Sequence, residues 1–329
     1  GFPMSGKTQV LMECLMNTSK FYGWKHLVYF PDVGSNVEII ADLIHKKTGV
    51  LEYYDFGRYV TSSLHGRVRG RETDFELNLP LTAEIENEKI TNLDCILKFL
   101  ATNPKLIHGD GNLYASVCNV VNYKLARTYI DNMQRSDFIR YAAFKKNASN
   151  CARFVTDTLI ESVTNSSIKK RLQNSKWFTP STIGNVIISD TENFVYVVSE
   201  QGSISEFNST VGRENRRFFL DTLKGYSPSL VGSLEPKHTP IKEDHAQWLS
   251  GIGTGAWFEV YELECNDDYR FRRISPYGNI DCDGIYEIDS KGFDINSQYQ
   301  FIYYSNCLFF YIEQDSKQYR FDFKKDFEV

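Results

Sequence analysis

The stretch N-A-S-N-C-A-R-F-V-T-D-T-L-I-E-S-V, residues 147–163, decides the fold of the first half of the chain. Its apolar residues recur at the spacing of a helix, and asparagines suited to helix N-caps stand directly before Cys151. The pattern therefore predicts a helix that begins at Cys151. Similar spacing predicts helices over residues 91–101 and 123–134, and residues 50–59 are typical of a strand.

From Trp248 onward the sequence changes to short runs in which aromatic and polar residues alternate between turns. This alternation is typical of strands that bury one face. Six such strands favour a small barrel or sandwich, so we predict an α+β protein whose C-terminal part is all β. The runs are A-W-F-E-V-Y-E-L (256–263), Y-R-F-R-R-I (269–274), G-I-Y-E-I (284–288), Y-Q-F-I-Y-Y (299–304), L-F-F-Y-I-E (308–313) and Y-R-F-D-F (319–323).

Length, charge and cysteine content limit the classes of protein to which the chain can belong. Its 329 residues suffice for about two domains, and a net charge of -5 argues against nucleic-acid binding. No apolar run reaches about 18 residues, so we expect no membrane insertion. The seven cysteines form no C-x-x-C pair, and residues 1–19 lack the pattern of a signal peptide. We therefore expect a reducing compartment, the cytoplasm.

Cys151 is the residue with the clearest chemical potential. A thiol in the first turn of a helix lies near unpaired backbone N–H groups, which stabilise a thiolate and make the cysteine a candidate nucleophile. The alternative is a small buried residue that happens to begin a helix. A thiol nucleophile needs a base, and His108 in L-I-H-G-D-G is a candidate, although each of the six histidines taken alone fits a structural role better. Asp55 could orient the base, or could instead pair with Arg58.

Arginines are concentrated in residues 57–74, which we interpret as an ordered surface loop because charges and glycines are frequent there. Arg58, Arg67 and Arg69 could bind a substrate carboxylate or phosphate through bidentate contacts. Acidic residues follow at once, however, and they favour the alternative of a self-neutralising network on the surface.

Four segments, in their order along the chain, resemble an uncharacterised bacterial family that is in turn similar to the circularly permuted branch of the NlpC/P60, papain-like thiol hydrolases. They are Y-Y-D-F-G-R-Y (53–59), G-R-V-R-G-R-E-T-D-F-E-L (66–77), H-G-D-G (108–111) and S-N-C-A-R-F-V-T-D (149–157). The likeness to the hydrolase superfamily covers about residues 28–164. It implies a papain-like domain over residues 1–175. The Pro/Gly-rich stretches and the alternating runs after it predict a connector with some strand structure and a Pro-rich arm over 176–245 and a β-rich domain over 246–329.

The resemblance also implies roles for single residues. Cys151 takes the position of the nucleophile, and Asp55 that of the orienting residue. A base histidine is expected near Val37 and Glu38, where the sequence has none. His108 is therefore the predicted base.

The resemblance implies a hydrolase, an amidase, peptidase or acyltransferase, that acts on a peptide, acyl or small-molecule substrate without a metal or organic cofactor. The missing early histidine favours an alternative. In that reading the domain is a catalytically inactive papain-like scaffold, and the β-domain docks a protein partner. A basic surface for nucleic acid is not expected in either case.

Overall fold

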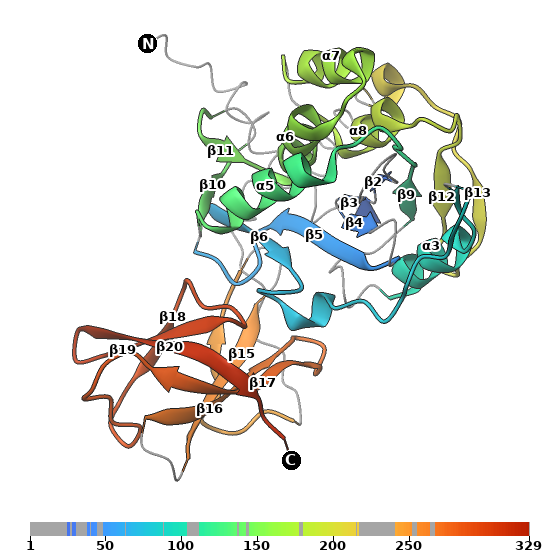
Figure 1. The fold of residues 1–329 in the computed structure, drawn as a ribbon. Coiled ribbons are helices and arrows are strands. Elements are labelled where there is room, and N and C mark those ends of the chain that lie inside the picture. Colours follow the sequence, from blue (N-terminus) through green and yellow to red (C-terminus); the bar gives the residue numbers. More distant parts are fainter. Residues whose placement is uncertain are drawn as a thin grey trace, which may run out of the picture.

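The computed structural model describes residues 25–26, 28–30, 38–39, 41–44, 49–62, 64–87, 89–103, 112–136, 138–142, 145–177, 180–214, 216, 241–251, 255–263 and 267–328. For the four strands before residue 45 it describes the backbone but not the side chains. The described residues form a mixed α+β N-terminal domain and a C-terminal antiparallel β-domain, which confirms the predicted fold class (Figure 1).

A mixed sheet lies at the centre of the N-terminal domain. Its strands follow the order β11-β10-β6-β5-β4-β2, with β3 paired to β4. The predicted strand over 50–59 is confirmed as β5, whose residues L-E-Y-Y-D-F-G are nearly all buried. The bounds are β2 Val28–Phe30, β3 Glu38–Ile39, β4 Ala41–Ile44, β5 Leu51–Gly57, β6 His65–Gly70, β10 Ile139–Tyr141 and β11 Ala148–Ser149.

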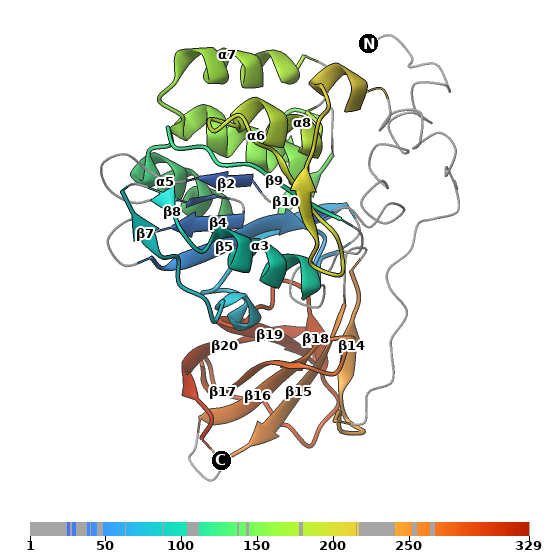
Figure 2. The same ribbon diagram turned by 90° about the vertical axis from the view of Figure 1, so that its right-hand side faces the viewer.

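Helices α5 and α6 pack against this sheet on the side away from the C-terminal domain, with α7 beyond α6, whereas α3 packs against a second, smaller sheet (Figures 1 and 2). The helices predicted over 91–101 and 123–134 and the helix predicted to begin at Cys151 are all confirmed. Phe154 on the last of these is fully buried and packs its ring 5.9 Å from that of Phe56 on β5. The bounds are α3 Leu93–Thr102, α5 Tyr123–Gln134, α6 Cys151–Ser162, α7 Ser166–Ser175 and α8 Thr182–Ser189.

A smaller sheet, of order β1-β9-β12-β13, completes the N-terminal core. Part of the segment that we predicted as a connector belongs to the N-terminal core. Strands β12 and β13 of this sheet and helix α8 all follow residue 175. Val186 and Val198 from this segment are fully buried in the N-terminal core. The bounds are β1 Lys25–His26, β9 Leu113–Ala115, β12 Tyr196–Val198 and β13 Ile204–Glu206, with a separate hairpin of β7 Ile85–Glu86 and β8 Lys89–Ile90.

The C-terminal domain is a seven-stranded antiparallel sheet of order β14-β15-β16-β17-β20-β19-β18 that curls into a near-barrel. Its first and last strands meet through the side chain of Gln247, which donates to the carbonyl of Tyr299 at 3.0 Å and accepts from the Phe301 amide at 2.9 Å. The bounds are β14 Gln247–Leu249, β15 Ala256–Glu262, β16 Asp268–Ile274, β17 Ile280–Ile288, β18 Gln300–Ile302, β19 Phe309–Gln314 and β20 Lys317–Asp326.

The two domains are in direct contact along residues 60–76. Val60 belongs to the buried cluster of the C-terminal domain, and the ring of Phe75 packs edge-on against Phe323 at 5.2 Å. The Cys307 amide donates to the carbonyl of Thr73 at 2.9 Å. The 3-10 turn η1, Phe75–Leu77, lies at this contact.

The prediction of a surface loop over residues 57–74 was wrong for the central part of that segment. Residues 65–70 form β6, and all of them except His65 are buried. Gly66 and Gly70 face the helices, where a Cβ atom would lie 2.9 Å from the ring of Phe56 and 2.5 Å from that of Tyr54. The glycines thus admit large rings, whereas the alternation of a strand directs Arg67 and Arg69 to the other face, toward the C-terminal domain. Within the described ranges, no helix has the length and apolar character needed to cross a membrane.

Candidate active site

Cys151 occupies the first position of α6, as the sequence predicts. The side chain of Asn150 accepts a hydrogen bond from the amide of Arg153 at 2.9 Å, which makes it the N-cap. Pairing of β10 with β11 places Tyr141 opposite Ser149, two residues before the cysteine. The local cap and the strand pairing together fix the thiol at the junction of helix and sheet.

The thiol shares a hydrogen bond with a tyrosine that the sequence did not indicate. The hydroxyl of Tyr141 shares a hydrogen bond with Cys151 Sγ at 3.2 Å. The guanidinium of Arg58 stacks over the Tyr141 ring at 4.4 Å from its centroid. Arg58 is thus the one of the three predicted substrate-binding arginines that contacts a direct partner of Cys151.

Opposing influences set the acidity of this thiol. Burial raises the pKa of Cys151 and is the largest effect. The Tyr141 hydrogen bond and the charge of Arg58 lower that pKa, while the charge of Asp55 raises it. The net result is a raised pKa, so the thiol rests protonated at neutral pH and needs a base before it can attack a substrate.

Among the residues whose side chains the structure describes, no histidine is bonded to Cys151. His108, the predicted base, lies outside those residues. His65 pairs through Nδ1 with the Ser62 hydroxyl at 2.9 Å, and His245 packs its ring edge-on against Tyr261 at 5.0 Å. The identity of the base therefore stays a prediction.

Asp55, the predicted orienting residue, is held by an arginine. It lies on β5 directly opposite Arg69 on β6. Arg69 donates from Nε to Oδ1 at 3.0 Å and from Nη2 to Oδ2 at 2.5 Å, a bidentate pair. The guanidinium of Arg69 also stacks on the ring of Tyr59 at 3.8 Å. Arg69 thus matches most of the charge of Asp55, which still raises the pKa of Cys151.

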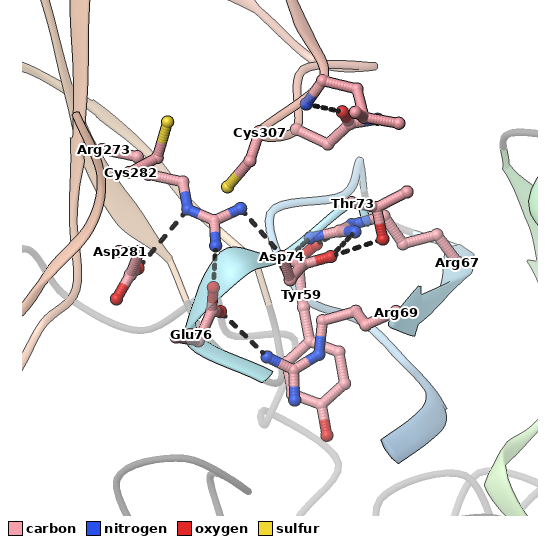
Figure 3. A network of polar contacts seen from close by, with 12 residues as sticks. Tyr59, Arg67, Arg69, Thr73, Asp74, Glu76, Arg273, Asp281, Cys282 and Cys307 are labelled. Carbon is pink, nitrogen blue, oxygen red and sulfur yellow. Dashed lines mark hydrogen bonds and ion pairs between the residues drawn. The ribbon is translucent and has the colours of Figure 1, made fainter. Parts of the chain in front are cut away.

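A buried network of arginines and carboxyl groups extends from Arg69 into the C-terminal domain (Figure 3). Arg67 donates to both oxygens of Asp74 at 2.6 Å. Arg273 on β16 donates to Asp74 Oδ1 at 3.0 Å and to Glu76 Oε2 at 2.7 Å. A substrate role for Arg67 or Arg69 would therefore require these buried pairs to open. The predicted self-neutralising network exists, but it lies inside the protein rather than on its surface.

The carboxyl groups of this network titrate in opposite directions. Burial alone would raise the pKa of Asp74, but Arg67 and Arg273 outweigh it and hold that pKa well below its usual range. Burial raises the pKa of Glu76 despite Arg273, and burial together with the neighbouring Glu76 raises that of Asp281 well above its usual range. The larger rise is at Asp281, so a proton on these two groups is favoured on Asp281 and leaves Glu76 as a carboxylate that accepts from Arg273 and Arg69.

Arg273 is a functional candidate that sequence reasoning missed, although its strand carried a signal. On β16 the positions that alternate inward include Phe271 and Arg273, both buried. A charged residue at an inward-facing position of a strand indicates a buried partner of opposite charge. The sequence could not show that its partners Asp74 and Glu76 stand about 200 residues earlier in the chain, at separations of 199 and 197.

Comparisons with known proteins support the division into two parts. Residues 41–168 match the family model described as "Type VI secretion system effector TseH-like", and residues 246–324 match that of the "DUF6695 C-terminal domain". The search of curated proteins and the search of solved structures each gave no match. The chain therefore carries a TseH-like domain, which contains Cys151, followed by a C-terminal β-domain that matches a second family model.

Proposed function

We propose that the TseH-like domain is a thiol hydrolase or acyltransferase that acts on an amide or ester, and that the chain is a type VI secretion effector. The observation that carries the proposal is Cys151, which begins a capped helix inside the matched region. The resemblance to permuted NlpC/P60 hydrolases supports the same role for this residue. Its substrate is a peptide, an acyl compound or another small molecule.

The proposed reaction follows from the position of the thiol. Cys151 Sγ loses its proton to a histidine and attacks the carbonyl carbon, and backbone N–H groups at the start of α6 stabilise the oxyanion that forms. The intermediate collapses to a thioester as the leaving amine or alcohol takes the proton from the histidine. Water, or an acceptor nucleophile, then cleaves the thioester and restores the thiol.

The remaining predicted residues take supporting roles in this proposal. His108 is the candidate base, and Asp55 is the candidate orienting residue because its charge already acts on the thiol. Arg58, next to Tyr141, is the candidate contact for an anionic group of the substrate. The proposed chemistry uses no metal or organic cofactor.

The test is acyl trapping on the full chain. We expect p-nitrophenyl acetate to leave an acetyl group on Cys151, seen by peptide mass spectrometry, and to release nitrophenol in repeated turnovers. Cys151→Ala abolishes both signals and His108→Ala slows turnover, whereas Cys95→Ser, a change at an exposed thiol on α3, leaves them unchanged. Acetylation spread equally over the exposed cysteines would contradict the hydrolase proposal.

The second candidate function is an inactive papain-like scaffold with a binding role, in which the β-domain docks a protein partner. Two contacts favour it. The hydroxyl of Tyr141 already occupies a hydrogen-bonding position on Cys151 Sγ, and Arg69 already holds Asp55. In this case the wild-type chain and Cys151→Ala behave alike toward every ester and amide tested.

A further inference from the structure

Arg273 belongs to the C-terminal domain, yet it contacts carboxylates of the TseH-like domain. It is 2% exposed, and its two terminal nitrogens bond to Asp74 and Glu76. Its Nε lies 3.4 Å from Asp281 Oδ2 in its own domain. Breaking such a buried pair on one side leaves an uncompensated charge, so these contacts constrain both domains.

Glu76 links Arg273 to Arg69, whose partner Asp55 acts on the thiol. Its Oε2 accepts from Arg273 at 2.7 Å, and its Oε1 lies 3.4 Å from Arg69 Nη1. Arg69 uses its Nε and Nη2 for Asp55, whose charge acts on Cys151. Figure 3 shows Glu76 between the two guanidiniums.

We infer that Arg273, supplied by the C-terminal domain, is a positioning residue for the Cys151 site. Its hydrogen bond to Glu76 allows Arg69 to keep its bidentate pair with Asp55. The inference deepens the proposed function and rests on it for its catalytic meaning. It makes the β-domain part of the catalytic unit rather than an appended module.

The charges of the network give the direction of the effect. Without Arg273, Asp74 keeps Arg67, but Glu76 retains Arg69 as its only cation among its described contacts. Two carboxylates, Glu76 and Asp55, then compete for one guanidinium. The charge of Asp55 becomes less well matched, and a nearby negative charge disfavours the thiolate of Cys151.

Other groups that face the thiol stay in place when Arg273 is changed. Tyr141 on β10, Tyr59 and Arg58 act on Cys151 from the N-terminal domain. The domains also retain the backbone bond from Cys307 to Thr73 and the packing of Phe75 on Phe323. A change in the thiol can therefore be read separately from loss of the domain contact.

The experiment measures alkylation of Cys151 by iodoacetamide against pH on the full chain, with peptide mass spectrometry as the readout. We expect Arg273→Gln to slow labelling roughly three- to tenfold at mildly alkaline pH and to move the profile to higher pH. Adding Glu76→Gln removes the competing carboxylate and is expected to restore the wild-type profile. The Arg273→Lys variant keeps the positive charge but loses the planar guanidinium that bonds two carboxylates at once. Its labelling profile is expected to lie between those of the wild type and Arg273→Gln.

The matched control is Arg270→Gln on the same strand, which removes a bidentate pair with Asp283 inside the C-terminal domain. It is expected to leave the profile unchanged. A wild-type profile for both Arg273→Gln and Arg273→Lys, or a shift that Glu76→Gln does not reverse, overturns the inference.

Labelling and turnover separate the two proposals. A chain that shows the expected labelling shifts but no acyl turnover retains the coupling between Arg273 and Cys151 and rejects the hydrolase. A chain that turns over ester substrate equally well with and without Arg273, and with the same pH profile, retains the hydrolase and rejects Arg273 as a positioning residue.

Discussion

At the scale of single residues, the pKa of Cys151 depends more on its neighbours than on its position at the start of a helix. The start of a helix favours a thiolate, but burial and the charge of Asp55 act against it and raise the pKa of the thiol. Burial also raises the pKa of Tyr141 well above its usual range, so this hydroxyl keeps its proton. Tyr141 is therefore available to donate a hydrogen bond to the sulfur once the thiolate forms.

The first prediction tests this hydrogen bond. Tyr141→Phe removes the donor while keeping the ring, so the thiolate loses about 1.5 kcal/mol of stabilisation and Cys151 ionises roughly tenfold less readily. Alkylation of Cys151 slows accordingly, measured by peptide mass spectrometry. Cys95 in the same digest gives the internal reference, and Tyr129→Phe on α5 is the control variant. Equal rates for Tyr141→Phe and wild type would show that the hydroxyl does not act on the sulfur.

At the scale of elements, the sequence was sufficient where structure is local. The start of α6 could be predicted because Asn150, the cysteine and the first apolar positions are neighbours in the chain. Strand β6 could not, because its arginines are buried only through Asp55, Asp74 and Glu76, and the last two also need Arg273 from a distant strand. The contact of Tyr141 with Cys151 could not be predicted for the same reason, because it depends on the pairing of β10 with β11.

The second prediction compares two helix caps. Asn150→Ala at α6 and Asn165→Ala at α7 each remove a side chain that accepts hydrogen bonds from helix amides. Each is expected to lower the free energy of unfolding, measured in urea, by about 1 kcal/mol. Only the first frays the turn that carries Cys151. Because burial is the main cause of the raised pKa of this thiol, fraying exposes it and its alkylation becomes faster. The Asn165→Ala variant keeps the wild-type labelling rate; a faster rate in both variants would contradict the local explanation.

At the scale of the whole molecule, the contact between the domains combines buried ion pairs with apolar packing. Arg67, Arg69 and Arg273 face Asp55, Asp74, Glu76 and Asp281, while Val60 and Phe75 pack on the β-domain. Truncating one partner of such a buried pair typically costs about 3–5 kcal/mol, so the network ties the domains together strongly. The stability of the molecule should accordingly depend on pH.

The third prediction follows from the pKa shifts in this network. Glu76 and Asp281 have raised pKa values in the folded state, so they bind protons before the unfolded chain does and stability rises as the pH falls from neutral toward about 4. Below that, the lowered pKa of Asp74 acts in the opposite sense, because the unfolded chain then binds the proton and stability falls. Thermal unfolding across this range should therefore show a maximum at mildly acidic pH.

The Asp281→Asn variant provides the check on this assignment. It removes one of the two groups that take up a proton on folding, so the rise in melting temperature from neutral to mildly acidic pH becomes smaller. The fall at more acidic pH is retained, since Asp74 is unchanged. A rise of wild-type size in this variant would place the titrating groups elsewhere.

The amide of Gln247 has a consequence for how the β-domain behaves in a crowded solution. The outermost strands of an open sheet present unpaired backbone groups that can recruit a strand from a neighbouring molecule and seed fibrils. By bonding across the seam to Tyr299 and Phe301, this one side chain occupies backbone groups that would otherwise serve as such a template. The domain can thus be rich in aromatic strands and still resist polymerising edge to edge.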